Sequence, residues 1–197
     1  MEHPIITTED TLDTLNTVDE AQLAHYAERL TGLRYETVCT VEALTFSPEM
    51  GRHVTMTTLQ VLPESGVCGQ YPGKQWWQGR RVPGRQISAV SADVLDALEI
   101  PHDVPGDNLV IRGLDLGRFA PGDILRVGDA LLSITPTLHR PCAKLARRTS
   151  LTRMKAISAG RLRGVLLDAL APATITVGDL VEMILLPPGD VLPPGDV

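Results

Sequence analysis

Short runs of strand-forming residues, interrupted by glycine and proline, limit what this chain can fold into. The 197 residues include 17 glycines and 15 prolines, which implies many turns. Gly128-Asp129 is typical of a tight turn between two strands. Strands are predicted at residues 37–46, 53–62, 85–90, 108–112, 124–127, 130–135, 165–169 and 180–185. Many short strands at close spacing predict a mainly β domain, either a barrel or a sandwich. Its core must be aliphatic, because aromatic residues make up only 4% of the chain.

Helical patterns are fewer, and they suggest a division into three parts. Thr17 as N-cap with Glu20 three residues later predicts a helix over residues 18–31, inside an N-terminal extension of residues 1–36. Ser91 is expected to cap a helix that runs through Leu98, and one or two helical stretches are expected over residues 142–159. The β domain would span residues 37–186. Residues 187–197 form a tail rich in proline and glycine, which we expect to be extended. The hexapeptide LPPGDV occurs at residues 186–191 and again at residues 192–197.

Composition excludes several classes of protein. A net charge of −6 and a pI near 5.3 argue against a general nucleic-acid binder. The three cysteines, Cys39, Cys68 and Cys142, have no metal-ligand spacing, and their odd number fits a reducing compartment better than a disulfide framework. The polar N-terminus has no visible signal peptide, and no apolar run reaches the length of a membrane span. These features predict a cytoplasmic protein.

Basic residues are concentrated in two windows that contain no Asp or Glu. Residues 65–92 hold four of them, and residues 130–167 hold eight; the full set is Lys74, Arg80, Arg81, Arg85, Arg140, Lys144, Arg147, Arg148, Arg153, Lys155, Arg161 and Arg163. If the two windows fold together, they form a positive pocket suited to an anion such as a phosphate. If they do not, the charges lie on separate solvated faces. Trp76 and Trp77 could stack on a ring system or cover the core.

Cys142 is the strongest candidate for chemistry. Arg140 and Lys144 flank it, and nearby cations favour the thiolate, which attacks electrophiles and binds soft metals. His139 lies three residues earlier and could reach the thiol if the segment turns. The alternative is a buried cysteine of the core, although Pro141 and the flanking charges place it near the surface. The chain has no GxSxG, P-loop, HExxH or CxxC motif.

Several motifs, in order along residues 40–186, resemble those of MOSC domains, which are named after the C-terminal part of molybdenum cofactor sulfurase. Arg85–Val90 is similar to the RQVSLI strand of that family, and Pro105-Gly106-Asp107-Asn108-Leu109 to its GENL motif. The stretches Gly113–Leu116 and Pro121–Ala130 resemble its GLdL…pGD.L.iG.a run. Arg140–Leu145 is similar to its PC.KL segment, and Val177–Val181 to its closing vGD.V.

The resemblance implies a β-barrel with helices on its flanks and a role for Cys142 as the residue that holds the molybdenum cofactor or its sulfur. The cofactor is an anionic pterin whose phosphate suits the arginines. The residues expected to bind it are Cys142, Arg140, Lys144, Arg85, Arg81, Lys74, Asn108 and His139. One segment departs from the pattern, because Gly69–Lys74 stands where many stand-alone members have GDRH. The pyridoxal-phosphate domain of the large family members is absent.

The resemblance favours a small molybdenum enzyme that reduces N-hydroxylated or related compounds. Electrons would come from a separate protein, since no flavin, haem or iron–sulfur motif is visible. A carrier of sulfur or of the cofactor, with no turnover of its own, is the first alternative. A barrel of this type that binds another anion is the second. The oligomeric state stays open.

Overall fold

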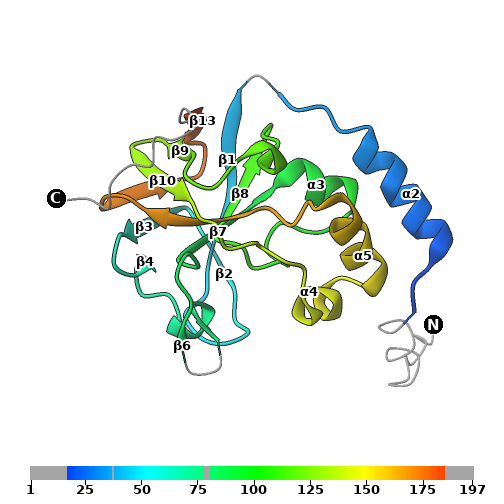
Figure 1. The fold of residues 1–197 in the computed structure, drawn as a ribbon, viewed down its shortest axis with the longest axis horizontal. Helices are drawn as coiled ribbons and strands as arrows, with labels where there is room; N and C mark the ends of the chain where they lie inside the picture. Colours follow the sequence, from blue (N-terminus) through cyan, green and yellow to red (C-terminus); the bar gives the residue numbers. More distant parts are fainter. Residues whose placement is uncertain (1–16, 37, 78–79, 185–197) are drawn as a thin grey trace, which may run out of the picture.

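A closed barrel of seven strands forms the centre of the molecule (Figure 1). The computed structural model describes residues 17–36, 38–77 and 80–184. Around the barrel the strands follow the order β1 (Cys39–Phe46), β8 (Leu109–Arg112), β7 (Ile87–Ser91), β11 (Val165–Ala169), β10 (Ala130–Ile134), β9 (Ile124–Val127) and β13 (Leu180–Ile184). Pairing of β13 with β1, with Cys39 opposite Val181, closes the ring. The predicted mainly β fold, a barrel with flanking helices, is confirmed.

Smaller strands lie beside the barrel. β2 (Val54–Met56) continues the sheet from β1, whereas β3 (Thr58–Leu62) belongs to a separate sheet with β12 (Ala173–Thr176) and β4 (Gly66–Val67). The single strand predicted over residues 53–62 is therefore wrong: it divides at Thr57, whose carbonyl oxygen accepts a hydrogen bond from Val177. A hairpin of β5 (Trp76–Trp77) and β6 (Arg80–Arg81) follows the short 3₁₀ helix η1 (Pro72–Lys74), and a second such helix, η2 (Leu116–Arg118), follows β8.

Aliphatic side chains fill the barrel. Leu44, Leu109, Leu125, Leu132 and Leu167 are fully buried there, as the low aromatic content requires. Alternate residues of β8 face opposite sides, so Leu109 and Ile111 join this interior cluster and Val110 joins a second cluster under the helices. The strand is therefore buried on both faces.

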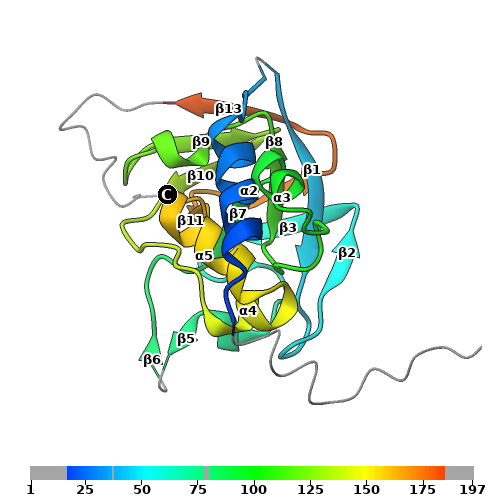
Figure 2. The same cartoon turned by 90° about the vertical axis from the view of Figure 1, so that its right-hand side faces the viewer.

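The helices of the described residues cover one side of the barrel (Figure 2). They are α2 (Glu20–Thr31), α3 (Ala92–Ala97), α4 (Ala143–Arg148) and α5 (Leu151–Gly160). The predicted N-cap of the first helix is wrong by two residues, because Asp19 rather than Thr17 accepts a hydrogen bond from the Gln22 amide. Asp19 also fixes this end of α2, since its amide donates to Thr152 of α5. Within the described ranges, no helix combines the length and the apolar character that crossing a membrane requires.

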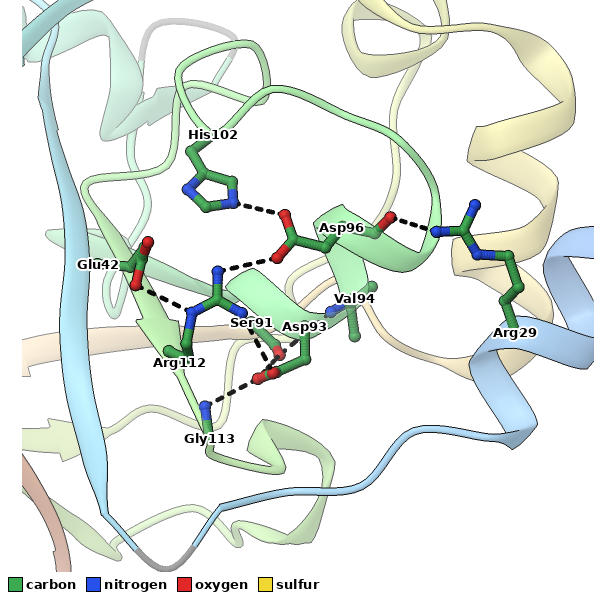
Figure 3. Close-up of polar contacts among 9 residues, drawn as sticks. All are labelled: Arg29, Glu42, Ser91, Asp93, Val94, Asp96, His102, Arg112 and Gly113. Atoms are coloured by element: carbon green, nitrogen blue, oxygen red, sulfur yellow. Dashed lines mark hydrogen bonds and ion pairs between the residues drawn. The ribbon is translucent and has the colours of Figure 1, made fainter.

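Helix α3 joins β7 to β8, which are the parallel pair of the barrel. Ser91 caps α3 as predicted, by accepting a hydrogen bond from the Val94 amide. Arg112, at the end of β8, binds the carboxylates of Glu42, Asp93 and Asp96 (Figure 3). Asp96 also contacts His102 at 2.9 Å. Burial alone would raise the pKa of Asp96, but the hydrogen bonds from Arg112 and His102 outweigh it and lower that pKa. This network fastens α3 to the barrel.

Candidate functional site

The segment that leads into β8 brings distant parts of the chain together at one end of the barrel. Leu109 pairs with Leu44 near the end of β1 and with Ala89 of the parallel strand β7. Asn108 is 1% exposed, and its side-chain amide group donates hydrogen bonds to the backbone oxygen of Thr45 and to the side-chain oxygen of Gln70. The Asn108 side-chain oxygen accepts from the backbone amide of Ser88, 3.2 Å away. Asn108 thus joins β1, β7 and the loop after β4.

Asp107 is a buried carboxylate with two basic neighbours. Its Oδ2 atom accepts a hydrogen bond of 2.5 Å from Nη1 of Arg163, and its Oδ1 atom lies 3.6 Å from Nε2 of His139. The side chains of Asp107, Arg163 and His139 are 2%, 9% and 12% exposed. A carboxylate buried this deeply needs a cationic partner to offset its lost hydration, and Arg163 supplies one.

Gly106 gives the neighbouring backbone its shape. Its φ is +73°, and a Cβ atom built there would lie 1.8 Å from the ring of His53. Only glycine therefore lets the imidazole lie directly against the main chain. The ring of His53 in turn lies 2.9 Å, at Nε2, from Nη1 of Arg148 in α4. Since a guanidinium can only donate, Nε2 acts as the acceptor. The loop after β1 is thereby linked to α4.

Cys142 lies at the start of α4 and is exposed. Its backbone oxygen accepts hydrogen bonds from the amides of Leu145 and Ala146, so the residue is fixed at the N-cap by its main chain while the thiol makes no capping bond. Arg140, Lys144 and Arg147 are also exposed. Within the residues that the structure describes, none of these three cations forms an ion pair with a carboxylate. The predicted position near the surface is confirmed.

Several basic residues of the second window have partners of their own. From the second window, Arg163 binds Asp107, Arg148 binds His53, and Arg153 lies over the ring of Tyr26 while donating to the Leu98 carbonyl. From the first window, Arg85 is half-buried just before β7. The predicted binding residues Lys74 and Arg81 lie in η1 and β6, but their side chains, like those of Arg80, Trp76 and Trp77, lie outside the described part of the structure. A shared pocket that includes them stays a prediction.

Several residues of this end of the barrel did not stand out in the sequence. Asp107 was visible inside the motif that contains Asn108, but nothing indicated that its partners would be Arg163 and His139. Gln70 lies in the segment that departs from the family pattern, and it is buried against Asn108. His53 gave no signal, because its role depends on Gly106 and Arg148, both far away in the chain.

An open depression of about 210 Å³ lies at the end of β10, just before the segment that carries His139 and Cys142. It is lined by Pro83, Gly84, Ser133, Ile134, Thr135, Pro136, Thr137 and Asp168. Its threonine hydroxyls donate to the Gly84 and Pro83 carbonyls. Within the described ranges, no group of three or more His, Cys, Asp or Glu side chains is placed to hold a metal ion.

Comparison with known families tests the resemblance that the sequence motifs suggested. The family profile of the MOSC domain matches residues 75–182, which is more than half of the chain. This chain belongs to the MOSC domain family. MOSC domains are associated with binding of the molybdenum cofactor in general. No match is found among curated proteins.

Solved structures agree with this MOSC fold. The YuaD protein of Bacillus subtilis superposes with a TM-score of 0.62 at 15% identity, covering 78% of this chain and 100% of that one. YiiM of Geobacillus stearothermophilus gives a TM-score of 0.56 at 20% identity and covers 77% of each chain. YiiM of Escherichia coli gives 0.54 at 20% identity, with 77% of this chain and 72% of that one covered. At these identities the likeness establishes the fold alone.

Proposed function

We propose that this MOSC domain binds the molybdenum cofactor with the Cys142 thiolate as the protein ligand to molybdenum. The observation that carries the proposal is the exposure of Cys142 at the start of α4, next to exposed cations that no described carboxylate neutralises. Molybdenum is a soft metal, and a thiolate is the soft ligand that a protein can offer it. An exposed thiol can reach a metal that is itself held by a bound organic group.

The residues around Cys142 fit the rest of the cofactor. Its phosphate needs positive charge, which Arg140, Lys144 and Arg147 can provide without first breaking an ion pair among the described residues. Arg85 and His139 lie in segments around the same barrel end and are the further binding residues that we propose. Asn108 lies at this end too, but its side chain is buried and hydrogen-bonded, so we propose that it supports the site without contacting the cofactor. Lys74 and Arg81 complete the proposed set by sequence position.

We further propose that the protein reduces N-hydroxylated or related compounds with electrons from a separate donor protein. The bound cofactor would supply the redox chemistry, while the protein binds and orients it. Asn108, through its contacts with Thr45, Gln70 and Ser88, keeps the barrel end rigid beneath the site. The exposure of Cys142 leaves the reacting region open to substrate.

The test is to express the chain in hosts with and without molybdenum cofactor synthesis and to measure molybdenum and pterin per mole of protein. Wild-type protein from the competent host should carry both, and Cys142→Ala should lose most of the molybdenum. Cys68→Ala is the matched control, because Cys68 is the other exposed thiol. Equal molybdenum in wild type and Cys142→Ala would reject ligation by Cys142. Reduction of an N-hydroxylated probe with a chemical electron donor then tests the enzyme activity.

A carrier of sulfur or of the cofactor is the second candidate, and the same exposure of Cys142 favours it, because a donated group must be reachable by a partner. A persulfide on Cys142, detected by mass spectrometry in protein without reductase activity, would support this function over the enzyme. Absence of both persulfide and transfer to an acceptor would remove it.

A further inference from the structure

Asp107 contacts both ends of the connection that carries Cys142. This connection leaves the barrel after Ile134 of β10 and returns at Val165 of β11. His139 lies near its beginning and Arg163 near its end, and the Asp107 carboxylate lies against both, with one oxygen toward each. Cys142, α4 and α5 lie between these two contacts. One buried carboxylate on the segment before β8 therefore joins the entry and the exit of the connection.

The neighbouring Gly106 adds a third attachment to the same connection. The ring of His53 lies against Gly106 and against Arg148, six residues after Cys142. Along the chain the thiol is thus flanked by His139, which contacts Asp107, and by Arg148, which is linked to Gly106 through the ring of His53. Packing and charge hold the segment on each side of Cys142, whereas the thiol itself stays exposed.

We infer that Asp107 is the positioning residue for Cys142, acting through His139. The inference deepens the proposed function, on which it rests only in taking Cys142 as the reacting residue. The competing explanation is that Asp107 serves stability alone, through its ion pair with Arg163. The two explanations differ in what happens to residues 136–145 when the charge is removed.

The experiment measures local opening without any cofactor. Hydrogen exchange of residues 136–145 and the rate of Cys142 alkylation by iodoacetamide are compared in wild type, Asp107→Asn, His139→Ala and the double variant. Cys68 serves as the internal reference for alkylation. Asp93→Asn is the matched control, because Asp93 is also a shielded carboxylate, bound to Arg112 and to the Gly113 amide at the opposite end of β8 from Asp107.

If Asp107 positions Cys142, Asp107→Asn and His139→Ala each raise exchange in residues 136–145 and change Cys142 alkylation. We expect roughly five- to thirty-fold faster exchange, the change that loss of one buried charged contact produces. In residues 136–145 the double variant should add little to Asp107→Asn, because that single substitution already weakens the contact that His139→Ala removes. Asp93→Asn should lower the melting temperature while leaving Cys142 alkylation unchanged.

Additive effects of the two substitutions, or exchange that rises equally throughout the protein, would overturn the positioning role and leave Asp107 with a purely structural one. If Asp107→Asn does not fold, His139→Ala decides alone: an unchanged Cys142 segment refutes the inference, and a locally opened one supports it. Because alkylation needs no cofactor, absence of molybdenum in the wild type would reject the proposed function without affecting this result.

Discussion

The side-chain amide of Asn108 donates a hydrogen bond of 2.6 Å to the side-chain oxygen of Gln70, 38 positions earlier in the chain. Both side chains are buried, so neither can exchange this partner for bulk water. The pair fastens the loop after β4 to the start of β8. Gln70 belongs to Gly69–Lys74, the segment that departs from the family pattern. In this chain the Gln70 side chain therefore has a buried hydrogen-bond partner, Asn108.

Replacing Asn108 by alanine should destabilise the fold strongly. The change leaves the Ser88 amide, the Thr45 carbonyl and the Gln70 oxygen without the partner that the structure gives them. We expect the free energy of unfolding to fall by about 3 kcal/mol, measured by urea denaturation. Gln60→Ala, at an exposed position of β3, is the control and should change it by less than about 0.5 kcal/mol. A loss for Asn108→Ala no greater than the control would contradict this account.

Gly106→Ala should cost more stability than Gly122→Ala. Both glycines have positive φ, +73° and +97°, so both variants pay the strain of a left-handed backbone, about 1 kcal/mol. A Cβ atom at Gly122 meets nothing within 4 Å, whereas at Gly106 it overlaps the ring of His53. Thermal denaturation should therefore show a clearly lower melting temperature for Gly106→Ala. Equal melting temperatures would mean that His53 moves aside without cost.

Among the three thiols, Cys39 should react most slowly with iodoacetamide. Burial raises the pKa of the Cys39 thiol, and the carboxylates of Asp93 and Glu36 raise it further, so less thiolate is present at a given pH. Cys68 and Cys142 are exposed. Peptide mapping at about pH 8 should show that Cys39 is modified at a rate roughly tenfold below the rates of Cys68 and Cys142, or lower still. The difference should disappear in concentrated urea, and its persistence there would assign it to something other than the fold.

Tyr35 should titrate well above the ordinary range of a tyrosine side chain. Burial, followed by the charges of Asp115 and Asp93, raises the pKa of Tyr35 to about 12. Because the folded protein holds this proton more tightly than the unfolded chain, the stabilisation is complete below about pH 10 and is lost as the pH rises toward 12. Difference absorbance between wild type and Tyr35→Phe should show tyrosinate forming in this range. A midpoint near pH 10 would contradict the burial of Tyr35 against these carboxylates.

The sequence indicated local elements better than their assembly. The strands at 124–127 and 165–169 match β9 and β11 residue for residue, because turn residues such as Gly128 and Gly164 bound them. Alternation across residues 53–62 could not reveal that Thr57 divides the run between two sheets. Strand β12 was missed, since four residues following Pro172 carry little periodic pattern.

The candidate site shows the same difference between local and long-range features. Cys142 could be proposed from its immediate neighbours, since charge and proline content are local properties of the sequence. Asp107 could not, because its contacts with His139 and Arg163 exist only once β8, β10 and β11 are in place. Residues whose role depends on partners far away in the chain are the ones that reading along the chain misses.

The closing contact of the barrel joins its first strand to its last. Before β13 pairs with them, β1 and β9 each have an unpaired edge to which a strand of another chain could bind. Every other strand of the ring precedes that step in the chain, so the final residues of the barrel complete the fold and also protect it from aggregation. A contact between such distant segments forms slowly, because a long loop must be closed first. Substitutions in β13 should therefore affect solubility during synthesis more than the activity of protein that has already folded.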